Sequence, residues 1–282
     1  MDLVFFVKVE LSVPSLCKEA CMQCVRLFSW CLVVFVAASV MVGIAHARDV
    51  TVGIGFSLPP YVIKEEHAGL EVDIIRESFA AVGMNTQFMY LPKLRLPVAF
   101  ADSMVDCVAT NATYDMSYES GLESFDSDVT LVYQNYAVAM KRSGFNLQSI
   151  NDLKDKVVLS FNNAVKYLGS EYAAMATENL QYKELADQSL QVRMLYSGRV
   201  QVVVSDKRIF LYWRKKLLSG SASEDIDIKQ DVQFFSIFPP SPRNLSFKDR
   251  ELCDAFNRGL RSLHKNGAYD VIVQRYAGIE SE

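Results

Sequence analysis

The chain has 282 residues, with 29 lysines and arginines against 33 aspartates and glutamates, for a formal net charge of −4. A mildly acidic chain without a run of basic residues has no electrostatic attraction for phosphate backbones, which excludes nucleic acid as an expected partner. Four of its six cysteines precede residue 48, and the remaining two, Cys107 and Cys253, do not have metal-site spacing, so neither a metal nor a cofactor is expected.

The first 47 residues have the pattern of a targeting segment. Residues 27 to 45 are almost wholly apolar, Arg26 precedes them, and Ala45-His46-Ala47 follows, which is typical of a cleaved secretory signal. Because the apolar run is close to the ~20 residues that span a bilayer, a retained membrane anchor is the alternative. The acidic residues before Met22 are unusual in a signal, so the start of translation stays open between Met1 and Met22, with Met22 the hypothesis. A disulfide between the two remaining cysteines stays open, because sequence does not test its geometry.

Residues 49 to 83 predict a strand, an open loop and a helix. Val50, Val52 and Ile54 alternate as one face of a strand does, and Gly and Pro then mark a loop. The helix that follows ends at Gly83. In α/β sheets ligands bind beyond the carboxyl ends of the strands, so the loop residues Phe56 and Tyr61 are predicted to line a ligand site.

The same pattern continues along the chain and restarts after residue 141. Strands are expected at 86 to 91, 105 to 110, 136 to 140, 157 to 159, 200 to 204 and 232 to 238. A turn and a short helix are expected at 92 to 103, and helices at 165 to 175, 190 to 198, 207 to 213, 246 to 266 and 268 to 276. Residues 114 to 130 are polar and predicted to be irregular. In the last third, Ser246 with Asp249 resembles a capping box. The restart favours two lobes.

Polar residues follow three of these strands. Asn111 and Thr113 either reverse the chain or contact a ligand. Asn162 and Asn163 either cap the next helix or mark its N-terminus as an anion site. Asp206 is either the N-cap of the following helix or a carboxylate that faces a cleft.

The order of these pieces resembles the extracytoplasmic solute-binding proteins of family 3, the amino-acid-binding type. The matching stretches are Pro59-Pro60-Tyr61, Gly69-Leu70-Glu71-Val72-Asp73, Ser103-Met104-Val105-Asp106, Asp152-Leu153-Lys154-Asp155-Lys156-Val157-Val158, Ser197-Gly198-Arg199-Val200, Val204-Ser205-Asp206, Glu251-Leu252 and Asn266-Gly267-Ala268-Tyr269. The resemblance implies the type II periplasmic binding protein fold, with two α/β lobes, each a mostly parallel sheet flanked by helices, joined by two hinge crossovers. It divides the chain into a leader (1–47), a first lobe (48–140), a second lobe (141–234) and a return to the first lobe (235–282).

The resemblance also implies a function. A periplasmic protein of this kind captures a small polar solute between its lobes and presents it, as a monomer, to an inner-membrane ABC permease. A sensory role with a membrane receptor is the alternative partner, and a dehydratase or lyase on the same fold is the alternative chemistry. We expect binding rather than catalysis, because no zinc spacing, nucleophile elbow or phosphate loop is present.

One departure bears on the solute. In typical relatives an arginine a few residues after a threonine holds the α-carboxylate of an amino acid, and the carboxylate at the position of Asp206 holds its amino group. Here the threonine is Thr113, but the residue at the arginine position is Met116, which has no N–H donors. Either the solute is not an ordinary α-amino acid, or another cation replaces that clamp. Arg95 is the nearest candidate for such a cation in the first lobe, and an exposed arginine at a helix start is the alternative reading of it.

Cleavage after Ala47 makes a prediction that intact mass tests. The mass of the exported protein should equal that of a chain beginning at Arg48. A mature product that still carries residues 27 to 45 would instead indicate a membrane anchor.

Overall fold

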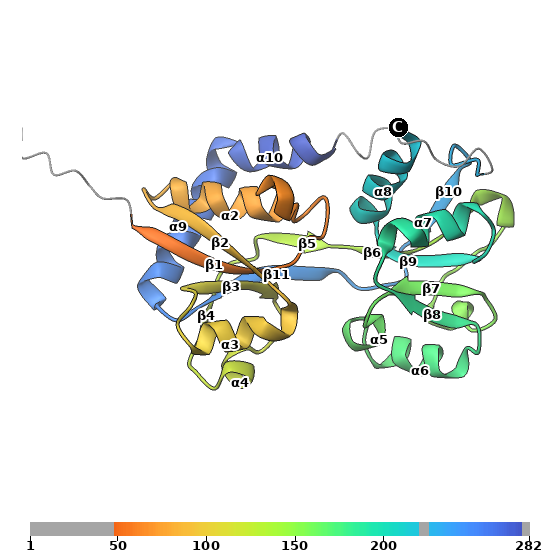
Figure 1. The fold of residues 1–282 in the computed structure, drawn as a ribbon, viewed down its shortest axis with the longest axis horizontal. Coiled ribbons are helices and arrows are strands. Elements are labelled where there is room, and N and C mark those ends of the chain that lie inside the picture. Colours follow the sequence, from red (N-terminus) through yellow and green to blue (C-terminus); the bar gives the residue numbers. More distant parts are fainter. Residues whose placement is uncertain (1–47, 220–225, 278–282) are drawn as a thin grey trace, which may run out of the picture. The chain divides into compact units, whose positions relative to one another are not determined.

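The computed structural model describes residues 48–219 and 226–277. The leader, with the signal and the start proposed at Met22, lies outside the described residues. The described chain contains two β-sheets, each with helices on both faces, which confirms the expected two-lobed α/β class (Figure 1). None of the helices in these ranges is long and apolar enough to cross a membrane.

The first sheet has the strand order β2-β1-β3-β11-β4, and β5 also pairs with β11. Its strands are β1 (Asp49–Gly55), β2 (Asn85–Leu91), β3 (Cys107–Asn111), β4 (Phe125–Asp126), β5 (Leu131–Tyr133) and β11 (Ser241–Phe247). β1 runs parallel to β2 and β3, whereas β11 is antiparallel to each of its neighbours. The last strand of the chain therefore lies inside the first sheet, between segments from its first half.

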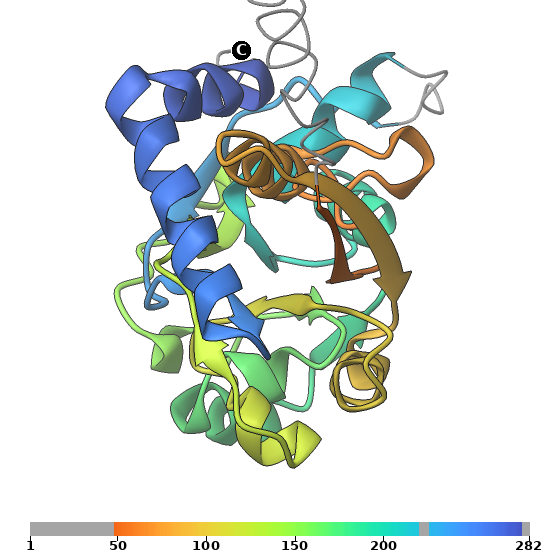
Figure 2. The ribbon, with the colours of Figure 1, turned by 90° about the vertical axis from the view of Figure 1, so that its left-hand side faces the viewer.

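Helices cover both faces of this sheet. They are α2 (Leu70–Ala80), α3 (Leu96–Ala101), α4 (Met116–Ser120), α9 (Arg250–Asn266) and α10 (Ala268–Ala277). α2, α9 and α10 lie together on one side, and α3 lies on the other (Figures 1 and 2). Phe79, Phe247 and Phe256 form the aromatic centre of the core between sheet and helices. Cys107 and Cys253 are both buried in that core as free thiols.

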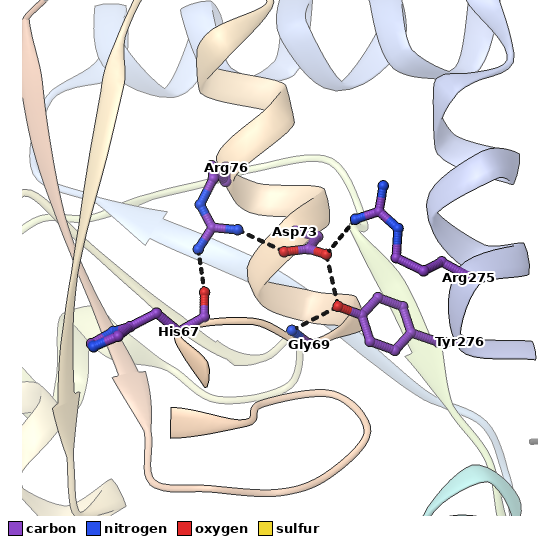
Figure 3. A network of polar contacts seen from close by, with 6 residues as sticks. All are labelled: His67, Gly69, Asp73, Arg76, Arg275 and Tyr276. Atoms are coloured by element: carbon purple, nitrogen blue, oxygen red, sulfur yellow. Dashed lines mark hydrogen bonds and ion pairs between the residues drawn. The ribbon is translucent and has the colours of Figure 1, made fainter. Parts of the chain in front are cut away.

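A carboxylate on α2 holds the last helix in place (Figure 3). Asp73 accepts hydrogen bonds from Arg76 at 2.6 Å, from Arg275 at 3.0 Å and from the hydroxyl of Tyr276 at 2.7 Å. That hydroxyl in turn accepts the N–H of Gly69 at 2.9 Å. Gly69 has φ 131°, and a Cβ there would lie 2.3 Å from the carbonyl oxygen of Tyr61, so this position requires glycine. α10 is thereby connected to the loop that precedes α2.

The second sheet has the order β10-β6-β9-β7-β8. Its strands are β6 (Asn135–Met140), β7 (Val158–Phe161), β8 (Tyr182–Leu185), β9 (Val202–Asp206) and β10 (Val232–Phe235). Its helices are α5 (Ala164–Tyr167), α6 (Ser170–Glu178), α7 (Gln188–Tyr196) and α8 (Lys207–Ser219). Separate apolar clusters lie beneath α5 and α6 and beneath α7 and α8, so both faces of the sheet are buried. Four 3₁₀ helices complete the described elements: Lys64–Glu66, Lys93–Arg95, Lys141–Ser143 and Ile150–Leu153.

The chain passes between the sheets at two places, after β5 and after β10. Gln134 is the residue between β5 and β6, and its side-chain amide donates to the carbonyl of Phe238, in the second crossing, at 3.0 Å. The two crossings are thus hydrogen-bonded to each other. Strand β6, which ends just before residue 141, pairs with β9 and β10 of the second sheet. The chain therefore passes from the first sheet to the second at Gln134. The lobe limits at 140/141 and 234/235 stay predictions.

The predicted strands and helices are present, with three corrections. The capping box is wrong, because Ser246 is a strand residue that donates to Asp126, and Asp249 alone caps α9. The helix predicted at 165 to 175 is two helices, because Gly169 adopts φ 90° between them. The irregular segment 114 to 130 contains α4 and β4, and β5, β8 and β11 were not predicted.

The close contact of α2 with α9 makes a prediction about stability. A Cβ at Gly259 would lie 1.8 Å from the carbonyl oxygen of Ser78, so Gly259→Ala forces the helices apart. We expect the free energy of unfolding, measured by urea denaturation, to fall by about 1–3 kcal/mol. Gly55→Ala is the matched control, because nothing lies within 4 Å of a Cβ there. Equal stability of the two variants would contradict this packing.

Candidate functional site

A cavity of about 360 Å³ has walls from both sheets. Strands β1, β3, β9 and β11 reach it, as do the crossing at Pro239 and Pro240 and the turn between α5 and α6. The parallel strands present their carboxyl ends there, which is where ligands bind in open α/β sheets. Its charged lining residues are Lys93, Arg243 and Asp206.

Asp206 ends β9 and begins α8, and it is 4% exposed. The backbone N–H groups of Arg208 and Ile209 donate to its Oδ1 at 2.9 and 3.2 Å, which makes it the cap of α8. Gln134 N donates to Oδ2 at 2.8 Å. Burial raises the pKa of this carboxyl, and the backbone donors act in the opposite direction. The structure joins the two roles that the sequence left open, because Asp206 caps a helix and also lines the cavity.

Tyr61 connects the first sheet to this carboxylate. Its hydroxyl lies 3.0 Å from both Oδ1 and Oδ2 of Asp206, and its ring packs on Tyr133 with 4.0 Å between centroids. The side chain is fully buried, and burial followed by the charge of Asp206 raises the pKa of Tyr61 well above its usual value. The phenol therefore stays protonated and donates its hydrogen across the gap between the sheets.

A buried ion pair holds Arg243 at another part of the cavity wall. Arg243, on β11, donates from Nε to Oε1 of Glu71 at 3.0 Å, and the hydroxyl of Tyr133 donates to Oε2 of Glu71 at 2.7 Å. Glu71 is 1% exposed, so its charge is balanced within the protein. Burial lowers the pKa of Arg243, but Glu71 and Tyr133 together act more strongly in the opposite direction, so the pKa of Arg243 is raised. The guanidinium also lies over the Tyr133 ring, 5.0 Å from its centroid.

Lys93 brings a second cation to the cavity. It follows β2, and its Nζ lies 4.5 Å from the ring centroid of Tyr167, at the end of α5 beside the second sheet. Lys93 is exposed at the cavity edge, and desolvation by the atoms around it, followed by repulsion from Arg243, lowers its pKa, while the charge of Glu71 acts in the opposite direction. The Lys93 contact is thus a second link between the lobes.

Asn111 and Thr113 are also brought to the cavity. Asn111 accepts at Oδ1 from the N–H and hydroxyl of Thr113, at 2.9 and 2.7 Å, and donates to Ser241 Oγ at 2.5 Å. They therefore form the turn and line the cavity together. The neighbouring Thr110 lines the cavity as well, and its buried hydroxyl has no hydrogen-bond partner among the residues described. Whether these three side chains contact a solute stays a prediction.

The other predicted site residues lie elsewhere. Phe56 is 49% exposed beneath the ammonium group of Lys64, and Arg95 is exposed beside the cavity without lining it. Asn162 borders a smaller hollow next to Asp187. Asn163 makes no side-chain cap, because its backbone is left-handed and the carboxylate of Glu184 accepts its N–H at 2.6 Å. That carboxylate already occupies the helix N-terminus at which an anion was expected.

Sequence reasoning missed Arg243, Lys93 and Tyr133. Arg243 and Tyr133 lie on β11 and β5, two strands that were not predicted. Lys93 lies in the same short turn as Arg95, and Arg95 was selected instead as the candidate cation. The departure at Met116 has a structural basis, because that side chain is 1% exposed and packs in an apolar cluster with Leu96 and Phe100. No group of three or more His, Cys, Asp or Glu in residues 48–219 and 226–277 is placed to hold a metal ion.

Solved structures with the same fold show what the chain is similar to. The sensor domain of a histidine kinase with similarity to periplasmic binding proteins has TM-score 0.62 and 18% identity, over 82% of this chain and 97% of that one. An ancestral arginine-binding protein bound to arginine has TM-score 0.60 and 22% identity, over 82% and 99%. The substrate binding protein of an amino acid ABC transporter has TM-score 0.56 and 17% identity, over 81% and 98%. At these identities the likeness establishes the fold.

The sequence itself identifies the family. No curated protein matches the chain. The family model for bacterial extracellular solute-binding proteins, family 3, matches residues 50–279, from the first strand through the last helix. The chain belongs to the bacterial extracellular solute-binding proteins of family 3.

Proposed function

We propose that this protein captures a small polar solute in the cavity between its two lobes and delivers it, as a monomer in the periplasm, to an inner-membrane ABC permease. The observation that carries the proposal is the 360 Å³ cavity, whose walls come from both sheets while the chain crosses between them at two places. Sites of this kind enclose small ligands with a few polar groups that fix orientation. Export by cleavage of the leader belongs to the same proposal.

The two crossings give the binding step its mechanism. Gln134 and the segment 236–240 are the places where the backbone can bend without breaking a sheet. A solute that contacts Lys93 and Arg243 on one side and the residues around Phe161 and Tyr167 on the other is bound best when the lobes are together. Its binding free energy then shifts the lobes toward the closed arrangement, which the membrane partner recognises.

A membrane sensor is the second candidate partner, and the similarity to the sensor domain of a histidine kinase favours it. Both partners require the same solute-dependent closure, so the solute site is common to them. Affinity capture with the solute-loaded and solute-free protein, using solubilised inner membranes, distinguishes a permease from a receptor.

Reversible binding, rather than catalysis, is the chemistry that we propose. Asp206 is the carboxylate that lines the cavity, and as the cap of α8 and the acceptor of Tyr61 it is committed to protein donors. A general base needs contact with the proton that it removes. Recovery of the bound solute in unchanged chemical form supports binding, and its conversion to a product would establish an enzyme.

A thermal-shift screen tests the solute-binding proposal. The protein is first unfolded and refolded, so that any solute carried from the cell is lost. A ligand that binds only the folded state raises the melting temperature, by an amount that grows with its concentration. We expect at least one class among organic acids, amino acids, amines and sugars to do so. A melting temperature unchanged by every class would contradict the proposal.

The hydrogen bond between the lobes makes a separate prediction. Tyr61→Phe keeps the ring against Tyr133 but removes the hydroxyl that donates to Asp206. We expect the free energy of unfolding to fall by about 1–3 kcal/mol in urea denaturation, because a hydrogen bond to a buried carboxylate is lost. Tyr118→Phe is the control, since Tyr118 is 83% exposed. Equal stability of the two variants would mean that the bond between the lobes contributes nothing.

A further inference from the structure

The charges at the cavity limit which solutes it accepts. Among the described residues that line it, Asp206 is the one carboxylate, and Lys93 and Arg243 are the cations. Glu71, behind Arg243, does not line the cavity. The class of solute therefore depends on which of these three groups still has bonding capacity.

The carboxylate of Asp206 has no free hydrogen-bonding capacity. A carboxylate has about four acceptor sites on its two oxygens. Oδ1 accepts from Tyr61, Arg208 N and Ile209 N, and Oδ2 accepts from Tyr61 and Gln134 N, so these sites are filled by the protein. An ammonium group of a solute needs a carboxylate or several oxygen acceptors in its place. The cavity offers it no uncommitted carboxylate.

The cations differ from each other. Arg243 has Glu71 as its counter-ion, and Glu71 takes only the Nε donor, while the guanidinium has further N–H groups on its two terminal nitrogens. Lys93 has no carboxylate within ion-pair distance in the described parts of the chain. The Tyr167 ring lies beside it, and it shares the influence of the single Glu71 carboxylate with Arg243. One positive charge at the cavity is thus unbalanced by the protein, which favours a solute with a single negative charge.

The remaining walls are largely apolar. Leu58, Leu94, Tyr133, Phe161, Tyr167 and Leu168 surround the polar groups. The buried Thr110 hydroxyl, unpartnered within the described chain, adds one neutral group that can bind an oxygen of the solute. This arrangement suits an apolar or aromatic body that ends in a charged head.

We infer that the solute is an organic monocarboxylate with an apolar or aromatic body and no ammonium group, held through its carboxylate by Lys93 and Arg243. The inference rests on the proposed solute-binding function and narrows it. A carboxylate accepts from both cations at once, and each of these charge-assisted hydrogen bonds is stronger than a neutral one. An α-amino acid with the same body carries an ammonium group that meets neutral oxygens but no uncommitted carboxylate among the described lining residues, so it binds more weakly.

Matched probes test the inference directly. 3-Phenylpropanoate, phenylalanine and 2-phenylethylamine share one skeleton and differ in charged groups, as do 4-methylpentanoate, leucine and 3-methylbutylamine. Each is titrated by calorimetry into the refolded, solute-free protein at neutral pH. We expect a carboxylate of at least one series to bind about tenfold or more tightly than the amino acid of that series, and the amines to give no heat of binding.

Variants at Lys93 test the residue assignment. Lys93→Met removes the unbalanced charge but keeps an unbranched side chain, and we expect it to weaken the carboxylate by about tenfold or more. Lys93→Arg keeps the charge and should retain most of the affinity. Lys265→Met, on the exposed end of α9, removes an equal charge elsewhere and should leave affinity unchanged. Equal affinity of the Lys93→Met and Lys265→Met variants would overturn the assignment.

The outcomes of these experiments distinguish failure of the carboxylate inference from failure of the proposed solute-binding function. Tighter binding of phenylalanine, leucine or either amine than of the carboxylates would overturn the inference and leave the solute-binding proposal standing. Absence of binding by both carboxylates would overturn it as well. If the broad thermal-shift screen also gave no ligand, the proposed function itself would fail.

Discussion

The carboxylate of Asp206 is the group on which the arrangement of the cavity depends. It caps α8 of the second sheet, accepts the hydroxyl of Tyr61 from the loop before α2, and accepts the N–H of Gln134 in the first crossing. Removal of any one donor would leave a buried acceptor less satisfied, which costs about 1–3 kcal/mol. One side chain therefore fixes the helix, the crossing and the loop together.

The part of the cavity wall at Arg243 depends on a buried ion pair instead of a helix cap. Burying Glu71 with Arg243 requires both ions to lose water, and such pairs add little to stability over apolar residues. Their value lies in position, because the pair holds a guanidinium at the cavity edge with its orientation fixed by Tyr133. Lys93 is held less firmly, by a ring of the other lobe. The cavity is thus lined by Arg243, whose orientation is fixed, and by Lys93, whose position can adjust.

Most strands and helices could be predicted from the sequence because their apolar residues recur at the local period. β11 could not, since it contains Pro242, which argues against a strand, and its pairing with β3 and β5 has no local signal. Arg243 was missed for the same reason, because it lies on a strand that depends on distant parts of the chain. Arg95 was selected because it follows β2. Asp206 and Asn111 were found, because each is the polar last residue of a strand with a clear apolar pattern. Contacts such as Asn111 with Ser241, 130 residues apart, have no local signal.

The position of β11 has a consequence for the order in which the chain folds. The second sheet is built from a continuous segment, Asn135 to Phe235, whereas the first needs β11 between β3 and β4 and needs α9 and α10 against α2. A chain that emerges from its N-terminus can complete the second sheet while the first still lacks a central strand. The first lobe thus begins first and is completed last. Until β11 has been synthesised, the edge of β3 with which it pairs has no neighbouring strand.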